Sequence, residues 1–256
     1  MASNTSWEKI SEETGMLQHD FASSPFVLSA SDIKTACQDF RKTAEKEVRI
    51  LCKQDSRESR PAVFSENGLF ILPRHNGEYY VVKGEGYVDV PEINSPIREY
   101  QRKLDFELKS SQVGDSEMQY LDFAYANSLI RTFMGDPSLV LTIRGRKYTP
   151  RFSFRVGQQI LEVSSVQTEV DAGYEGRNSI VLIEAKNSHT KNTIIRQLYY
   201  PFRQWYEETK KDVFTLFFEK RIIDEENIYY IWQYTFDDVN DYNSIRLVKS
   251  ERFRIV

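Results

Sequence analysis

Cysteine and histidine are scarce in this sequence of 256 residues, which has two of the former and three of the latter. Cys37 and Cys52 form no CxxC motif, and His19, His75 and His189 are scattered along the chain. Structural zinc sites need closely spaced cysteine and histidine ligands, and disulfide frameworks need several cysteine pairs. The sequence therefore predicts neither.

Long hydrophobic runs are also absent. No apolar stretch approaches the roughly 20 residues that cross a bilayer as a helix. The first ten residues, MASNTSWEKI, have neither the basic segment nor the apolar segment of a signal peptide. We therefore expect a cytoplasmic protein that does not contact a membrane.

The net charge of −4 argues against a protein that coats nucleic acid through bulk electrostatics. Two stretches are nevertheless locally basic. Residues 144–155, RGRKYTPRFSFR, contain five bases and no acid, and residues 41–60 contain seven bases and four acids. Each stretch is equally compatible with a solvated surface and with a nucleic-acid contact.

The length allows two domains, and the patterns change near residue 112. In residues 1–111, a helix capped by Ser31 precedes short β-prone runs, and Asn67-Gly68 and Asn76-Gly77 between these runs favour hairpin turns. This order is typical of a winged-helix-like DNA-binding domain. Ser95-Pro96 then predicts a helix that continues to Leu108 and links the two halves.

Residues 112–256 predict a mixed α/β (α+β) domain with a mixed sheet. A capping box at Ser116 to Gln119 begins a long helix that ends before Gly135-Asp136-Pro137. Strands are expected over 139–143, 151–156, 160–171 and 180–186. A helix over 193–209 and strands over 213–218, 228–236 and 245–248 follow.

The segment SIVLIEAKN, residues 179–187, begins as an apolar strand and ends with Glu184 and Lys186 on the same face, because alternate strand residues point the same way. On the preceding strand, Gln167, Glu169 and Asp171 also share a face. A return turn would bring Asp171 to Glu184. Two carboxylates at a strand end can hold a hard divalent cation, and a neighbouring ammonium can orient a water molecule.

This pattern, Asp171, twelve intervening residues and then Glu184-Ala185-Lys186, resembles the active-site motif of the PD-(D/E)XK nuclease superfamily, with Val170 at the position of its proline. The resemblance implies a restriction-endonuclease-like core in which Asp171, Glu184 and Lys186 are catalytic. Asp171 and Glu184 would bind Mg²⁺, and no organic cofactor is implied. Glu169 is either a third metal ligand or the partner of a basic residue.

Within this superfamily the chain looks most like a type II restriction endonuclease. That likeness implies a homodimer that cleaves specific sequences in double-stranded DNA and leaves 5′-phosphate ends. Glu117 and Gln197 are possible additional active-site residues, although the capping box explains Glu117 equally well. In Gln197's helix, Pro201 stands where a recombination-type nuclease has tyrosine.

Contacts with DNA are expected from the two basic stretches, since phosphates attract cations and arginine and glutamine read guanine and adenine. The candidates in the amino-terminal domain are Lys53, Gln54, Arg57 and Arg60. Those in a loop that leads into the catalytic sheet are Arg144, Arg146, Lys147 and Arg151. Two alternatives stay open: a repair or recombination nuclease of the same superfamily, and a non-enzymatic winged-helix regulator.

Overall fold

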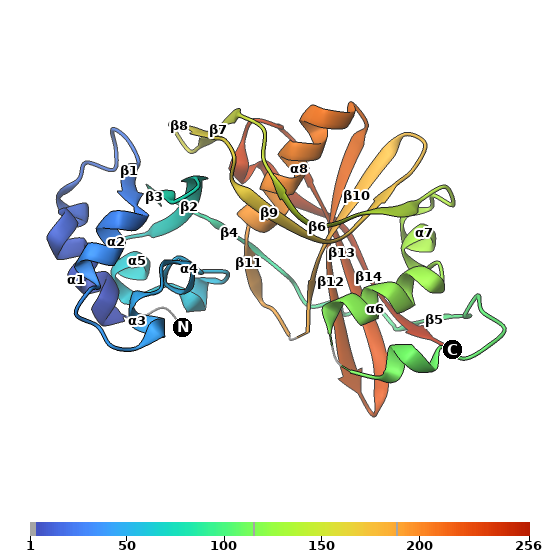
Figure 1. The fold of residues 1–256 in the computed structure, drawn as a ribbon. Coiled ribbons are helices and arrows are strands. Elements are labelled where there is room, and N and C mark those ends of the chain that lie inside the picture. The colour runs from blue at the N-terminus through green and yellow to red at the C-terminus, as the bar shows by residue number, and fades with distance from the viewer. Residues whose placement is uncertain (1–3, 115, 188) are drawn as a thin grey trace.

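The computed structural model describes residues 4–114, 116–187 and 189–256. In these ranges the chain has mixed α/β structure with a large mixed sheet. A smaller amino-terminal unit lies beside the body that contains this sheet (Figure 1). No helix in the described ranges is both long and apolar enough to cross a membrane.

The amino-terminal unit packs short helices against a three-stranded antiparallel sheet of order β1-β3-β2. Its helices are α1 (Asn4–Thr14), α2 (Ala30–Ala36), α3 (Thr43–Lys46), α4 (Val48–Leu51) and α5 (Ala62–Glu66), and its strands are β1 (Phe26–Ser29), β2 (Leu69–His75) and β3 (Glu78–Lys83). Short 3₁₀ turns lie at Met16–Gln18 and Arg57–Ser59. Trp7, Ile10 and Phe64 are fully buried in the core of this unit.

The predicted hairpin turn at Asn76-Gly77 is confirmed, since it joins β2 to β3 and Gly77 has a φ of 79° that favours glycine. The turn predicted at Asn67-Gly68 is wrong, because the residues before it form α5 and Asn67 ends that helix. The first predicted helix begins two residues earlier than expected. Its cap is Ser29, whose hydroxyl accepts a hydrogen bond from the Asp32 amide.

The large sheet has seven strands in the order β5-β14-β13-β12-β10-β9-β6. Strand β10 pairs in parallel with β12, β5 pairs in parallel with β14, and the other neighbours are antiparallel. The strands are β5 (Arg98–Tyr100), β6 (Val140–Tyr148), β9 (Gln167–Glu175), β10 (Ser179–Lys186), β12 (Asp212–Ile223), β13 (Glu226–Phe236) and β14 (Ile245–Ile255). A further 3₁₀ turn at Tyr242–Ser244 leads into β14.

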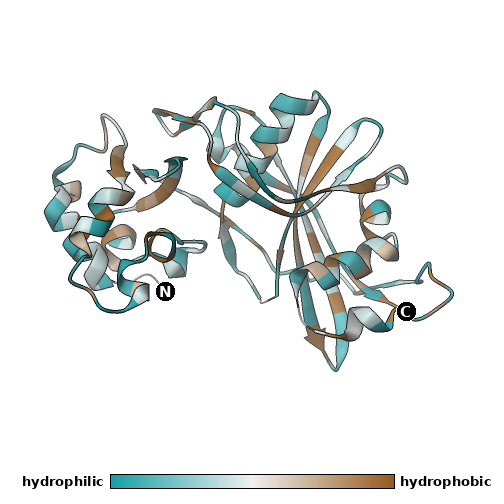
Figure 2. Ribbon diagram, in the orientation of Figure 1, coloured by the Kyte–Doolittle hydropathy of each residue, from teal (hydrophilic) through white to brown (hydrophobic). Residues whose placement is uncertain are grey.

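Helices cover both faces of this sheet. On one face, α8 (Arg196–Thr209) packs against a core that includes Leu182, Phe217 and Trp232. On the other face, α6 (Glu117–Ala126) and α7 (Leu129–Met134) pack against the alternate strand residues. Hydrophobic residues follow the strands between the helices, whereas much of α8 is hydrophilic (Figure 2). The long helix predicted from Ser116 is thus two helices, because Ser128 adopts a left-handed conformation with a φ of 61°.

Residues 84–112 do not contain the helix predicted after Pro96. Arg98–Tyr100 instead forms β5, which pairs with the end of β14, and a 3₁₀ turn follows at Lys109–Gln112. Strand β4 (Tyr87–Asp89) pairs with β11 (Asn192–Ile194), which directly precedes α8. β4 and β5 therefore each pair with a strand that is distant in sequence. A separate hairpin consists of β7 (Phe152–Val156) and β8 (Gln159–Val163).

Candidate active site

The pairing of β9 and β10 brings Asp171 and Glu184 together. In the antiparallel register Ala172 lies opposite Ile183, so the next pair along the strands is Asp171 and Glu184. The side chains of Ile180 to Ile183 are buried alternately in the two cores on either side of the sheet, so β10 is a central strand. The Ala185 amide donates a hydrogen bond of 2.8 Å to Asp171 Oδ2, which orients that carboxylate.

Lys186 completes the group, as the alternation along β10 predicts. Its ammonium forms an ion pair with Glu184 Oε1. The side chain of Glu184 is only 9% exposed and that of Lys186 is 25% exposed, so the pair lies at the boundary between the core and a cleft. Water cannot fully solvate these charges, and each therefore depends on its protein neighbours.

Burial raises the pKa of Glu184 to about 7, against the opposing effect of Lys186 and with a further contribution from the nearby Asp171 charge. Burial also raises the pKa of Asp171, although the Ala185 hydrogen bond favours its ionised form. Burial alone would lower the pKa of Lys186, but the charge of Glu184 outweighs it and the net shift is upward. Keeping the two buried carboxylates ionised at this separation is electrostatically unfavourable, and a cation bound beside them would offset that cost.

A cleft of about 560 Å³ lies over this group, between the amino-terminal unit and the large sheet. Its floor consists of side chains from β9, β10 and α8, and Glu117 at the start of α6 lines it as well. Gln197 also lines the cleft and accepts a hydrogen bond of 2.8 Å from Thr193 Oγ1. Both additional candidates therefore lie at the same cleft as the carboxylate pair.

Glu169 lines the cleft too, but its carboxylate accepts a hydrogen bond of 3.3 Å from Arg146. Within residues 4–114, 116–187 and 189–256, no three Asp, Glu, His or Cys side chains gather as a metal site. The structure therefore brings Asp171 and Glu184 together without Glu169 as a third ligand.

The carboxylate pair fits Mg²⁺. This ion is usually held by one or two carboxylates, and water and substrate phosphate complete its octahedral shell. Asp171 and Glu184 each have one oxygen that accepts no hydrogen bond from another described residue, and both side chains line the cleft. Hard oxygen donors, a shared face and access to a cleft are what such an ion requires.

The basic residues near 144–151 lie mainly on a strand and not in the predicted loop. Arg144, Arg146 and Lys147 belong to β6, the edge strand next to β9, whereas Arg151 follows it. Three of them are occupied by carboxylates: Arg144 pairs with Asp122, Arg146 with Glu169, and Arg151 with Glu162 at 2.9 Å. Lys147 is exposed.

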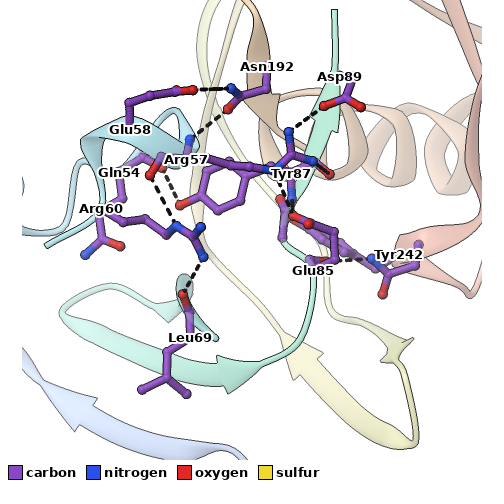
Figure 3. Close-up of polar contacts among 12 residues, drawn as sticks. Gln54, Arg57, Glu58, Arg60, Leu69, Glu85, Tyr87, Asp89, Asn192 and Tyr242 are labelled. Atoms are coloured by element: carbon purple, nitrogen blue, oxygen red, sulfur yellow. Dashed lines mark hydrogen bonds and ion pairs between the residues drawn. The ribbon is translucent and has the colours of Figure 1, made fainter. Parts of the chain in front are cut away.

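Three of the four candidates between Lys53 and Arg60 form the junction of the amino-terminal unit with β4 (Figure 3). Arg57 pairs with Asp89 at 2.5 Å, and Arg60 stacks over the Tyr87 ring at 5.1 Å and donates to the Leu69 carbonyl. Gln54 is 1% exposed, so its side chain is inside the protein and not on a DNA-accessible surface. Lys53 alone of these four lines the cleft.

Sequence reasoning missed two cations that line the same cleft, Arg49 on α4 and Arg196 at the start of α8. Arg49 is part of the basic stretch 41–60, and the composition of that stretch could have indicated it as a further candidate for DNA contact. Arg196 directly precedes Gln197, but nothing in the sequence indicates that α4 would lie across the cleft from it.

The family models divide the chain between residues 81 and 82. Residues 82–254 match the model of a family described as Domain of unknown function (DUF6997), and the chain belongs to this family. Residues 4–81 match a second model, Domain of unknown function (DUF6996). Searches of curated proteins and of solved structures found no match.

Proposed function

We propose that this protein is a Mg²⁺-dependent endonuclease that hydrolyses phosphodiester bonds in double-stranded DNA. The observation that carries the proposal is the convergence of Asp171, Glu184 and Lys186 on one face of β9 and β10, beneath a cleft. The surrounding order supports it: α6 and α7, the strands β6, β9 and β10, the helix α8, and then β12 parallel to β10. This is the helix, strand meander and helix order that the resemblance to PD-(D/E)XK nucleases implies.

In this mechanism Asp171 and Glu184 would hold Mg²⁺, which would supply charge stabilisation at the scissile phosphate and would make the attacking water more acidic. Lys186 remains protonated because Glu184 raises its pKa, so its ammonium donates a hydrogen bond that orients the attacking water. Water attacks phosphorus and releases a proton to solvent, the bond between phosphorus and the 3′ oxygen breaks, and the 3′ oxygen takes up a proton from solvent, so the products carry 5′-phosphate and 3′-hydroxyl ends.

The test uses supercoiled plasmid DNA with Mg²⁺ or with EDTA. Asp171→Ala and Lys186→Ala should each reduce the cleavage rate by at least about 100-fold, since metal ligation and positioned proton donors contribute factors of this size. The matched control is Glu175→Ala, which removes an exposed carboxylate of the same strand that pairs with Lys211 outside the cleft. Near-normal cleavage by either site variant, with circular dichroism unchanged, would refute the proposal.

In its narrower form the proposal is a type II restriction endonuclease, which acts as a homodimer on a symmetric sequence. One observation favours a second candidate, a nuclease of the same superfamily that recognises DNA structure instead of sequence. Gln54, Arg57 and Arg60, which were candidates for DNA contact, are buried or engaged within the protein. Sequencing the ends of digested phage DNA separates the two: unique ends support the restriction enzyme, and scattered ends support the second candidate.

A further inference from the structure

The cleft over the carboxylate pair continues past Lys186 into a second hollow. The second hollow has a volume of about 770 Å³ and is lined by the loop after β10 and by residues 53–59. The two hollows share Lys53, Asp55, Glu117 and Lys186 in their walls. They therefore form one groove, which runs from the carboxylate pair past Lys186 into the second hollow.

Four cations besides Lys186 line this groove. Arg49 and Arg196 line the hollow over the carboxylates, Lys191 lines the hollow beyond Lys186, and Lys53 lines both. Arg49 and Lys53 have side chains that are 88% and 72% exposed. Lys191 is also exposed and makes no ion pair with a described residue.

The groove cations are less tightly paired than most cations elsewhere in the molecule. Arg49 lies 3.7 Å from Glu47, Lys53 lies 3.6 Å from Asp55, and Arg196 lies 3.8 Å from Asp55. These distances exceed those of charge-assisted hydrogen bonds, which are about 2.7–2.9 Å. By contrast, Arg57 and Arg151 pair with carboxylates at 2.5 and 2.9 Å. A phosphate can thus approach the groove cations without breaking a short ion pair.

The walls of the groove are held in place by hydrogen bonds between the amino-terminal unit and the rest of the chain. Tyr200 Oη donates to the Pro73 carbonyl at 3.0 Å, and the Ile194 amide donates to the Asp55 carbonyl at 2.9 Å. Asn192 contributes a third contact, since its side-chain oxygen Oδ1 accepts a hydrogen bond from the Arg57 backbone amide at 2.7 Å. The cations of α4 and α8 are therefore presented to the same groove by a fixed framework.

We propose that the sugar-phosphate backbone of the cleaved strand lies along this groove, with Arg49 and Arg196 contacting phosphates in the hollow over the carboxylates, Lys191 contacting one in the second hollow, and Lys53 contacting one between them. The inference rests on the proposed nuclease function and adds the path of its substrate. It assigns phosphate contacts to the amino-terminal unit, which would contact the DNA backbone through Arg49 of α4 and through Lys53 in the segment after α4.

The experiment measures binding of a short fluorescein-labelled DNA duplex by anisotropy, in EDTA so that no cleavage occurs. The logarithm of the affinity is recorded against the logarithm of the salt concentration. Each lost phosphate contact makes this slope shallower by about 0.9 for duplex DNA, so Arg49→Ala/Lys53→Ala should reduce its magnitude by about 1.8. Arg196→Gln should reduce it by about 0.9.

The matched control is Arg41→Ala/Lys42→Ala, which removes one arginine and one lysine that are exposed in the same unit but do not line the groove. Its slope should equal that of the wild type. Equal changes in both double variants would mean that only overall charge matters, and no change in the groove double variant would mean that the strand lies elsewhere. Either result overturns the inference.

A gain of affinity provides a second arm. Asp55→Asn removes the carboxylate that faces both Lys53 and Arg196, so it should tighten DNA binding several-fold, whereas weaker or unchanged binding contradicts the groove path. Failure here is distinguishable from failure of the nuclease proposal. If the slopes change as expected but the wild type never cleaves DNA, the groove path is supported and the nuclease proposal is refuted. If cleavage requires Asp171 but the slopes do not change, the nuclease proposal is supported and the groove path is refuted.

Discussion

Glu184 and Glu219 are buried carboxylates on the neighbouring parallel strands β10 and β12, yet their surroundings differ. Glu219 is fully buried, accepts a hydrogen bond of 2.8 Å from the Thr190 amide, and pairs with Arg221 at 2.7 Å. Glu184 faces the cleft and has Lys186 as its one charged hydrogen-bond partner among the described residues. We interpret Glu219 as structural, because it accepts a hydrogen bond from the loop that follows β10, and Glu184 as a residue of the candidate site.

This contrast predicts different stability effects for the same substitution. Glu219→Gln should lower the free energy of unfolding by about 3 kcal/mol, because it leaves the buried Arg221 charge with weakened compensation. Glu184→Gln should cost clearly less, because burial already disfavours its ionised form and Lys186 can reach the cleft. Urea denaturation of both variants at neutral pH measures the difference, and an equal or reversed order would contradict the interpretation.

At the scale of residues, the sequence predicted that Asp171, Glu184 and Lys186 would lie together, but it did not show which residues of the basic stretches would be engaged within the protein. Glu184 and Lys186 share a face because of strand alternation, which is a local rule. The burial of Gln54 and the engagement of Arg57 depend on β4, which returns to this unit from beyond residue 84. Composition alone cannot show which cations of a basic stretch will find carboxylates in the folded chain.

Among the elements, β11 and the loop that leads into it from β10 connect the candidate site to the amino-terminal unit. Asn192 in β11 is central to this connection: it accepts from the Arg57 amide, and its own amide donates to both oxygens of Glu58 at 3.0 Å. Asn192 is 4% exposed, so water cannot replace these bonds easily. The position of Lys186 relative to Lys53 therefore depends on this side chain.

Asn192→Ala should lower the free energy of unfolding by about 1–3 kcal/mol, the cost of leaving buried polar groups without partners. Glu58→Ala should cost less, and the double variant should show a coupling energy of about 0.5–3 kcal/mol. Denaturation of the two single variants and the double variant gives this coupling directly. Strict additivity would show that the two side chains do not act as one junction.

The errors in predicted elements have a common cause. Pro96 and the spacing of Tyr100 and Leu104 favoured a helix, but Arg98–Tyr100 gains a parallel partner in β14 and the Tyr100 hydroxyl donates to the Asn127 carbonyl at 2.8 Å. Local propensity is weak compared with pairing of this kind. The strands β10, β12 and β13 were predicted correctly because their apolar runs are long and are separated by clear turn signals. The strand predicted over 160–171 is instead two strands, β8 and β9, because Ser165 between them has a φ of 52°, and the start of the helix predicted over 193–209 is the strand β11.

For the whole molecule, the amino-terminal unit forms one wall of the candidate active site. Pro73, Tyr79 and Cys52 line the cleft from this unit, whereas Asp171 and Glu184 line it from the large sheet. A sequence read without contacts predicts two domains but not the groove between them, since no local pattern records which surfaces will meet. The residues that line the groove therefore make both units part of one proposed substrate path.

Locating the metal tests the central claim most directly. Crystals of the wild-type protein soaked in MnCl₂ would be examined for anomalous scattering, since Mn²⁺ accepts the same oxygen ligands as Mg²⁺. The account predicts a peak in contact with the carboxylates of both Asp171 and Glu184, and no such peak in Asp171→Ala. Strong Mn²⁺ peaks elsewhere, with none between these two side chains, would contradict it.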